Sequence, residues 1–229
     1  VLWRHWIAKG IQAQLDHVQA QQALAEKERS LAQAHLAVLQ AQIEPHFLYN
    51  TLATVQYLVR KDTAGADFML GQLIRYLRLA MPAMRSELST LGREMELADA
   101  YLQLARIRMG GRLEAKTSLP EALQGVEFPP ALILTLVENA IKHGIEPKPG
   151  SGRIDVEARV DGHALVVEVR DSGVGLGGAA TAGTGVGLRN TRDRLAMLYP
   201  DRARLSVASL PTQGVVATIA IDNLLKERT

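Results

Sequence analysis

Four short segments of the chain have residue types that suit phosphate chemistry. In chain order they are QAQIEPHFLYNTL (40–52), LVENAIKHG (136–144), DSGVGL (171–176) and TGVGLRN (184–190). The first contains His46, whose imidazole could accept a phosphoryl group, and the second contains Asn139, whose amide oxygen could bind a hard cation. The last two are glycine-rich turns, whose amides could hold phosphate oxygens. Together the four segments predict transfer of phosphate from a nucleotide to a histidine.

The two glycine-rich turns could hold opposite ends of that nucleotide. Asp171 follows an apolar run, ALVVEVR, so its carboxylate lies where a strand ends and could accept a hydrogen bond from an exocyclic amine. Gly173 and Gly175 would let the backbone approach a flat ligand. The second turn runs into a predicted helix start, where unsatisfied N–H groups and the helix dipole favour phosphate. The residues offered there are Thr184, Gly185, Val186, Gly187 and Leu188.

Each of these features also has a simpler interpretation. A single Asp-Gly turn is usually only a turn, so the nucleotide site depends on the two turns together. A lone helical histidine is more often a surface residue, and His5, His17, His35 and His163 are interpreted in that way. The chain contains neither GKS nor GKT, which argues against a P-loop.

The segment around Asn139 has helical periodicity. Its apolar face is formed by Leu134, Val137 and Ile141, and its polar face has Thr135, Asn139 and His143 at four-residue spacing. Magnesium keeps several waters and binds few protein ligands besides substrate phosphates, so Asn139 could suffice as its protein ligand. Glu138 could hold a water of that shell, and Lys142 or His143 could contact phosphate. The alternative is a solvated helix face capped by Gly144.

A proline next to His46 marks a change of helical phase, because an interior proline loses a backbone hydrogen bond. Beyond Pro45 a new apolar stripe is formed by Leu48, Leu52, Val55 and Val59. At about 100° per residue, His46 and Asn50 lie within roughly 40° of each other on the opposite face. Glu44, the nearest carboxylate in sequence, could orient the ring or take its proton. Asn50 could position a water for the reverse reaction.

Composition narrows the class of protein. The 229 residues and 47% apolar content allow a sizeable core and two modules. Basic and acidic residues nearly balance, 26 against 24, so direct nucleic-acid binding is not expected. The absence of cysteine excludes disulfides, thiolate catalysis and cysteine-based zinc sites, and it agrees with a reducing compartment such as the cytoplasm.

The first part of the chain predicts a long helix. Between 11 and 43 neither proline nor glycine occurs, and apolar residues recur at alternating steps of four and three. This spacing predicts a parallel coiled coil, although Gln22 and Arg29 fall in the same phase; a single amphipathic helix is the alternative. No apolar run approaches the roughly 20 residues of a membrane span. The opening VLWRHWIAKG resembles a segment leaving a membrane interface, or simply begins an amphipathic helix.

The rest of the chain changes from helices to strands. A helical run over about 64–80, ended by Met81-Pro82, should pair with the His46 helix as a hairpin, and two hairpins would make a four-helix dimer core. A third helix is predicted over about 93–108, and others at about 130–143 and 188–199. Five alternating runs predict strands: LEAKTSL, RIDVEARV, ALVVEVRD, ARLSVASL and VVATIAI. The fold class is therefore α+β, with helices on one face of a mixed sheet.

In this order the motifs resemble those of LytS/YehU-type sensor histidine kinases over about 40–221. QIEPHFLYNTL is similar to their phospho-acceptor box, PPALILTLVENAIKHG to the N box, and DSGVGL with TGVGLRNTRDRL to the two G boxes of a GHKL ATP-binding domain. RIRMGGRL resembles the junction between the domains. The resemblance implies a dimeric four-helix bundle followed by an α/β sandwich of the Bergerat fold. The expected divisions are a connecting coiled-coil helix (1–40), a dimerisation and histidine phosphotransfer domain (41–108) and a catalytic ATP-binding domain (109–229).

The resemblance also implies roles for individual residues with ATP and Mg²⁺. His46 would be the phospho-acceptor, Asn139 the magnesium ligand and Asp171 the adenine contact. The glycines of an ATP lid and phosphate cradle would be Gly173, Gly175, Gly185 and Gly187. Phe47 stands where the larger class has an acidic base, and Thr135 stands where related ATPases have a water-activating Glu, so transfer should be preferred over hydrolysis. Gly214-Val215 replaces the Gly-Thr of many relatives, and no nucleotide contact is assigned there.

Partners and location follow from the same resemblance. Such kinases are homodimers below a transmembrane sensor, and they pass phosphate to an aspartate of a response regulator, often one with a LytTR DNA-binding domain. The chain would then be the cytoplasmic portion of an inner-membrane protein. Two other classes stay open. One is a GHKL-type ATPase that hydrolyses ATP without labelling itself, and the other is an ATP-binding interaction module without histidine phosphotransfer.

Overall fold

The computed structural model describes residues 3, 45–83, 88–176 and 184–224. By the contacts among its residues the chain divides into 1–48 and 49–229. In the first part the described residues are Trp3, which is exposed, and the beginning of helix α2. The predicted coiled coil and Glu44 lie outside the described residues. None of the described helices has the length and apolar content needed to span a membrane.

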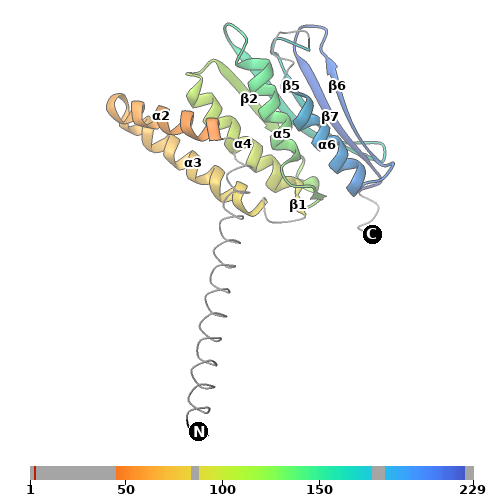
Figure 1. Cartoon of the computed structure of the whole chain (residues 1–229). Helices are drawn as coiled ribbons and strands as arrows, with labels where there is room; N and C mark the ends of the chain where they lie inside the picture. The colour runs from red at the N-terminus through yellow and green to blue at the C-terminus, as the bar shows by residue number, and fades with distance from the viewer. Residues whose placement is uncertain (1–2, 4–44, 84–87, 177–183, 225–229) are drawn as a thin grey trace. The chain divides into compact units, whose positions relative to one another are not determined.

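Helices α2 (Pro45–Lys61) and α3 (Thr63–Ala83) confirm the predicted helical runs (Figure 1). Pro45 is the first residue of α2, where its missing N–H costs nothing. Asp62, directly before α3, caps the helix, because its Oδ1 accepts a hydrogen bond from the Gly65 N–H at 2.9 Å. The predicted end of α3 at Met81-Pro82 is wrong, since the helix runs to Ala83. A proline this close to a helix end removes only one terminal hydrogen bond.

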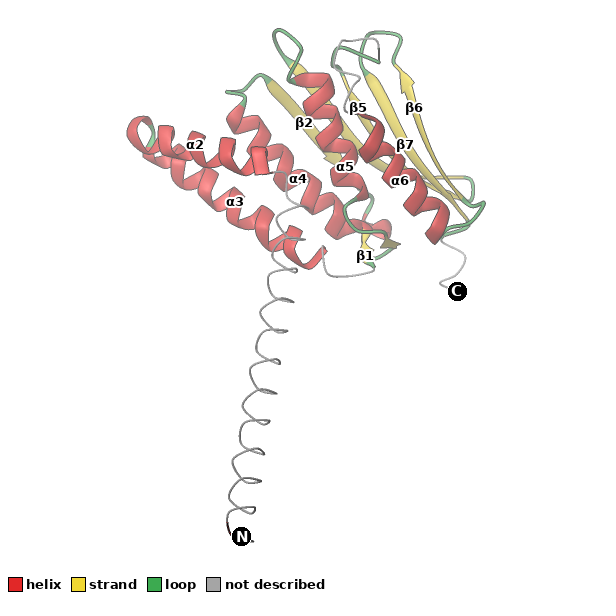
Figure 2. Ribbon diagram, in the orientation of Figure 1, coloured by secondary structure: helices red, strands yellow, loops and turns green. Residues whose placement is uncertain are grey.

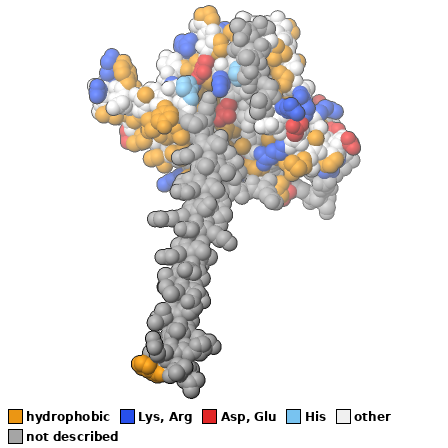
Figure 3. Space-filling model, in the orientation of Figure 1, with side chains coloured by type: hydrophobic (Ala, Val, Ile, Leu, Met, Phe, Trp, Pro, Cys, Tyr) orange, Lys and Arg blue, Asp and Glu red, His pale blue; other side chains and the backbone are white. Residues whose placement is uncertain are grey.

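Many large apolar side chains of α2 and α3 are exposed, and Figure 3 shows hydrophobic atoms gathered on the surface of this hairpin. They are Tyr49, Leu52, Tyr57, Val59, Phe68, Leu70, Ile74 and Met81. The face that is buried includes Phe47 and Thr51 instead. The stripe that contains Leu52 and Val59 is therefore not covered within the hairpin.

Helix α4 (Leu91–Arg108) follows a short strand, β1 (Ser89–Thr90), and begins two residues before the predicted start. Thr90 caps it, because the Thr90 Oγ1 accepts a hydrogen bond from the Arg93 N–H at 3.3 Å. Strand β1 pairs with β3 (Glu127–Phe128), and these two short strands were not predicted. Helix α4 packs on α3, where the ring centroids of Tyr76 and Tyr101 lie 6.0 Å apart.

The five predicted strands are confirmed and form one sheet of order β2-β4-β5-β7-β6. They are β2 (Leu113–Ser118), β4 (Gly152–Asp161), β5 (Ala164–Asp171), β6 (Ala203–Ser209) and β7 (Val215–Asp222). Strands β2 and β4 are parallel, and the other neighbours are antiparallel. A 3₁₀ turn, η1 (Glu121–Leu123), follows β2.

Helices α4, α5 (Leu132–Asn139) and α6 (Thr184–Leu198) lie on one face of this sheet (Figure 2). The chain beyond α5 continues as a π-helical segment, η2 (Ala140–Ile145), where an ordinary helix to residue 143 was predicted. The described fold is thus α+β with the predicted layers, which confirms the fold class. Its core is the apolar interface between these helices and the sheet.

Glu94 is an exception in this core, because its side chain is ionisable and only 1% exposed. Burial raises the pKa of Glu94 from its ordinary 4.5 to about 7, against the effect of hydrogen bonds from Ser89 and Ala131 and the charge of Arg194. The folded chain therefore holds a proton on this residue more tightly than the unfolded chain does. The free-energy cost of ionising Glu94 is absent below pH 4.5 and develops fully above pH 7.

We predict that Glu94→Gln, a neutral residue of the same shape, gains stability relative to the wild type as the pH rises. Between pH 4.5 and pH 8 the difference in unfolding free energy should move by on the order of 3 kcal/mol in favour of the variant. Urea unfolding of both proteins across this range measures the difference. A difference that does not change with pH would contradict the assignment.

Candidate nucleotide-binding site

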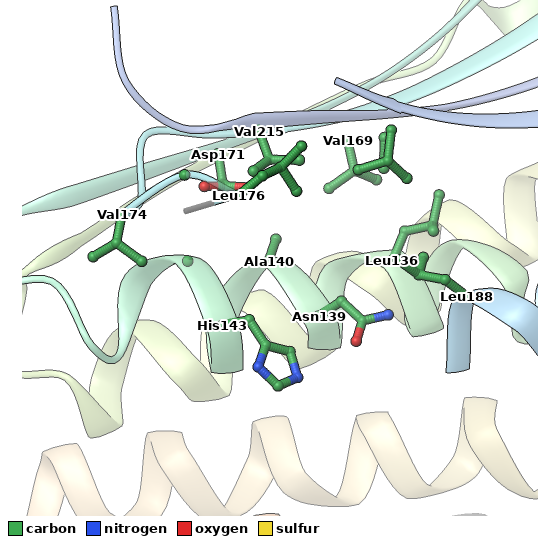
Figure 4. A pocket seen from close by; sticks show the side chains of 14 residues that line it. Leu136, Asn139, Ala140, His143, Val169, Asp171, Val174, Leu176, Leu188 and Val215 are labelled. Carbon is green, nitrogen blue, oxygen red and sulfur yellow. The ribbon is translucent and has the colours of Figure 1, made fainter. Parts of the chain in front are cut away.

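A cavity lies between the segment α5–η2 and the ends of β5 and β7, next to the start of α6 (Figure 4). Its lining is largely apolar, which suits the faces of a flat aromatic ring. The lining includes Leu136, Ala140, Val169, Val174, Leu176, Leu188, Val207, Val215 and Ala217. The polar side chains that line it belong to Asn139, His143 and Asp171.

Asp171 is the last residue of β5 and is 5% exposed. Its Oδ1 accepts a hydrogen bond from the Gly173 N–H at 2.8 Å, which closes the turn after the strand. Burial raises the pKa of the Asp171 carboxyl, while the N–H groups of Gly173 and Val215 and the charge of Lys148 act in the opposite direction. A buried acceptor held in this way can recognise an exocyclic amine.

Three glycines from separate segments surround Asp171 at distances that no side chain would allow. A Cβ on Gly144 would lie 2.6 Å from the Asp171 Oδ1, and one on Gly173 would lie 2.3 Å from the Gly144 Cα. Gly214, with φ of +111°, would place a Cβ 1.9 Å from the Asp171 carbonyl oxygen. The Val174 N–H also donates a hydrogen bond to the Gly144 oxygen at 3.1 Å. The turn after β5 is therefore locked against η2.

Sequence reasoning gave Gly173 a different contact and missed two of these glycines. Gly173 was expected to admit a flat ligand, and its close approach is to the Gly144 backbone. Gly144 was considered only as a helix cap, and it lies inside η2. Gly214 received no role because the usual Gly-Thr signal is absent. Lys148 was also missed; its Nζ donates a hydrogen bond to the Ser172 oxygen at 2.5 Å.

The π-helical turn gives η2 a wider backbone than an ordinary helix, and such turns are frequent at functional sites. The Glu146 N–H donates to the Ile141 oxygen at 2.8 Å, the five-residue step of a π-helix. Within η2, His143 lines the cavity and Lys142 is exposed. Glu138 is half-buried at the end of α5 and is not among the lining residues.

Asn139 and His143 project from the same side of their helix, whereas Ala140 faces the sheet (Figure 4). Among the described residues, the Asn139 Nδ2 is buried without a hydrogen-bond partner. Gly187 adjoins it, since a Cβ there would lie 3.6 Å from that nitrogen. The Asn139 Nδ2 could therefore donate a hydrogen bond to a ligand. The oxygen of the same amide is the hard type of donor atom that magnesium requires.

The second glycine-rich segment lies inside α6, which begins at Thr184 rather than at about residue 188 as predicted. The N–H groups of such a helix start can bind phosphate. The backbone of Thr184, Gly185 and Val186 forms the first turn of α6, and Leu188 reaches the cavity. The structure therefore brings Asn139, His143, Asp171, Gly175 and Leu188 to one cavity. Residues 177–183, between the two glycine-rich segments, lie outside the described residues.

The remaining candidates belong to helix α2 or precede it. His46 is exposed, Asn50 is half-buried, and Phe47 after the histidine is buried. Phe47 occupies the position at which the resemblance to the larger class implies an acidic base, and its side chain cannot accept a proton. Thr135, at the position of the water-activating Glu of related ATPases, uses its hydroxyl within α5, where Oγ1 donates to the Ala131 oxygen at 2.9 Å.

Comparison with known proteins first defines the class. Residues 126–224 match the family model of histidine kinase-, DNA gyrase B- and HSP90-like ATPases, and residues 34–113 match the histidine kinase model. A solved histidine kinase domain from the Erythrobacter litoralis EL346 blue-light activated histidine kinase aligns with 83% of this chain and 94% of that chain, at 21% identity and a TM-score of 0.46.

Curated relatives then define the family. Sensor histidine kinase BtsS of Escherichia coli (strain K12) is 33% identical over 193 residues, which are 83% of this chain and 34% of BtsS. Sensor protein LytS of Staphylococcus haemolyticus is 33% identical over 208 residues, which are 86% of this chain and 36% of that protein. The chain belongs to the LytS-type sensor histidine kinase family, which confirms the resemblance of its motifs. It spans about a third of the length of these relatives.

We predict that Gly173→Ala weakens binding of ATP with magnesium by at least about tenfold, because its Cβ would force the Asp171 turn away from Gly144. Isothermal titration calorimetry measures this affinity. Gly71→Ala in α3 is the matched control, since a Cβ there meets nothing within 4 Å. Wild-type affinity in the Gly173 variant would show that the locked turn does not shape the site.

Proposed function

We propose that this chain is the catalytic region of a sensor histidine kinase, which binds ATP in the cavity and transfers its γ-phosphoryl group to His46. The observation that supports the proposal most strongly is the buried Asp171 acceptor in an apolar cavity, with the Asn139 amide at its edge. An adenine ring needs the first arrangement, and magnesium with phosphates needs the second.

The residues divide the work of binding between two ends of the cavity. Asp171 accepts from the adenine amine while the apolar walls cover the ring faces. Asn139 would hold Mg²⁺, which would neutralise phosphate charge when bound. Glu138, next to Asn139 in sequence, would orient a water of the metal shell, and Lys142 and His143 would contact phosphate. The backbone from Thr184 to Leu188 and the turn around Gly175 enclose the phosphates as a lid.

In the transfer step a ring nitrogen of His46 attacks the γ-phosphorus. The bond from that phosphorus to the bridging oxygen breaks, and ADP leaves with the electron pair. The ring must lose one proton, and Glu44 is the proposed acceptor because Phe47 cannot serve. The phosphoryl group then passes to an aspartate of a response regulator, of the LytTR type by family resemblance. Asn50 positions water for the reverse reaction that removes phosphate.

Assembly and location complete the proposal. The exposed apolar surface of α2 and α3 supports a homodimer through these hairpins, with 1–40 as a connecting coiled coil, 41–108 as the dimerisation domain and 109–229 as the catalytic domain. The family supports a place for this region on the cytoplasmic side of the membrane, below a transmembrane sensor.

We predict that the wild-type protein labels itself from ATP radiolabelled at the γ-phosphate, and that the label is lost in acid and kept in base, as a phosphohistidine requires. His46→Gln should bind ATP with wild-type affinity but take no label, because the nucleophile alone is missing. Asn139→Ala should lose labelling even where nucleotide still binds, because the cation has no protein ligand.

The same assay separates the alternatives. Release of phosphate without protein-bound label would identify an ATPase, and ATP binding with neither activity would identify a binding module. Label that persists in His46→Gln would contradict the assignment of the acceptor.

A further inference from the structure

Helix α4 holds the helix of Asn139 at both ends. Near the start of α4, the Glu94 Oε2 accepts a hydrogen bond from the Ala131 N–H at 2.6 Å. At its end, Arg108 forms an ion pair with Glu146, directly after η2. The two helices therefore run side by side in the same direction, with a charged side chain of α4 bonded to each end of α5–η2.

The start of α5 has no side-chain cap of its own. Its N-cap residue is Ala131, which has no side chain that can cap a helix. Ala131 also has φ of 62°, a left-handed conformation that is unfavourable for a non-glycine residue. The Ala131 N–H itself also needs an acceptor, which a Glu or Gln at the third helical position supplies in a capping box and which Leu134 cannot supply. Glu94 supplies this acceptor from 37 positions away.

Helix α6 also contacts the segment before α5. The Arg194 Nη1 donates a hydrogen bond to the Pro130 oxygen at 2.7 Å, one residue before Ala131, and the Arg194 charge acts on Glu94. Glu94 is 1% exposed, and Ser89 also bonds to it. One buried carboxylate thus lies where α4, α5 and α6 meet, at the end of α5 away from the cavity. Asn139 is eight residues along, roughly 12 Å.

We propose that Glu94 is a positioning residue for the nucleotide site, which acts by holding the start of α5 so that Asn139 and the Asp171 turn stay in register. The proposal rests on the proposed binding of ATP. Helix α5 is a rigid connection of two turns, so a shift at Ala131 moves Asn139 relative to Gly187 on α6. Glu94 touches neither nucleotide nor metal in this scheme.

Two substitutions of similar size separate a positioning role from simple core packing. Glu94→Gln keeps a carbonyl oxygen for the Ala131 N–H, whereas Glu94→Met fills the same space without an acceptor. Calorimetry on the full chain measures the affinity for ATP with magnesium. Glu94→Gln should bind within about twofold of the wild-type affinity, and Glu94→Met should bind about fivefold to tenfold more weakly. The measurement is made at a temperature where circular dichroism shows both variants folded. Leu123→Ala, a buried change outside the site, controls for lower stability alone.

Autophosphorylation kinetics give the second measurement. Glu94→Met should raise KM for ATP and lower kcat, because the cation ligand is displaced. Glu94→Gln should leave both close to the wild-type values. If the Met variant does not fold, Glu94→Asp takes its place, since the shortened side chain withdraws the acceptor while keeping the charge, and it should also weaken binding.

The outcomes are distinct. Wild-type affinity for ATP in folded Glu94→Met or Glu94→Asp would overturn the positioning role. Equal losses of affinity in Glu94→Gln and Glu94→Met would overturn it too. A wild-type protein that does not bind ATP would instead refute the proposed function, before any variant is considered.

Discussion

The close contact between the backbones of Gly144 and Gly173 is the constraint on which the rest of the site depends. It brings the end of β5 against η2 with no side chain between them, so the carboxylate of Asp171 is buried at the base of a cavity whose walls are apolar. A carboxylate in this setting is costly unless backbone N–H groups reach it, and those of Gly173 and Val215 do. The same contact fixes how far α5–η2 lies from the sheet. Asn139 and His143 therefore reach the edge of the cavity rather than its interior.

The helices around this contact divide the remaining tasks. Helix α5 carries Asn139, and η2 continues it as a π-helix, in which the backbone is wide enough to place Gly144 beneath Asp171. Helix α6 adds Gly187 beside the Asn139 amide. Helix α4 packs on both α3 and α5, so the hairpin that contains the proposed dimer surface is joined through α4 to the nucleotide site.

Much of this arrangement could be predicted from sequence, and the rest could not for a common reason. The five strands follow from short alternating runs, and the places of Asp171 and Gly175 follow from local turn chemistry, whereas α6 begins about four residues before its predicted start. Gly144, Gly214 and Glu94 were missed because their roles come from contacts with residues far away in the chain. The π-helical turn has the composition of an ordinary helix, so periodicity gives no sign of it. The buried face of α2, with Phe47 and Thr51, was likewise decided by its tertiary neighbours.

The most direct test of the account compares the affinities of the protein for ATP and GTP. If the buried Asp171 carboxylate recognises an exocyclic amine, ATP should bind at least about tenfold more tightly than GTP, whose ring presents an acceptor oxygen at the corresponding position. Asp171→Asn should reduce the difference in affinity between ATP and GTP, because the asparagine amide can also donate a hydrogen bond to the guanine oxygen. Calorimetry with both nucleotides and magnesium measures it. Equal affinity of the wild-type protein for ATP and GTP would contradict the proposed role of Asp171 and, with it, the account of the cavity as an adenine site.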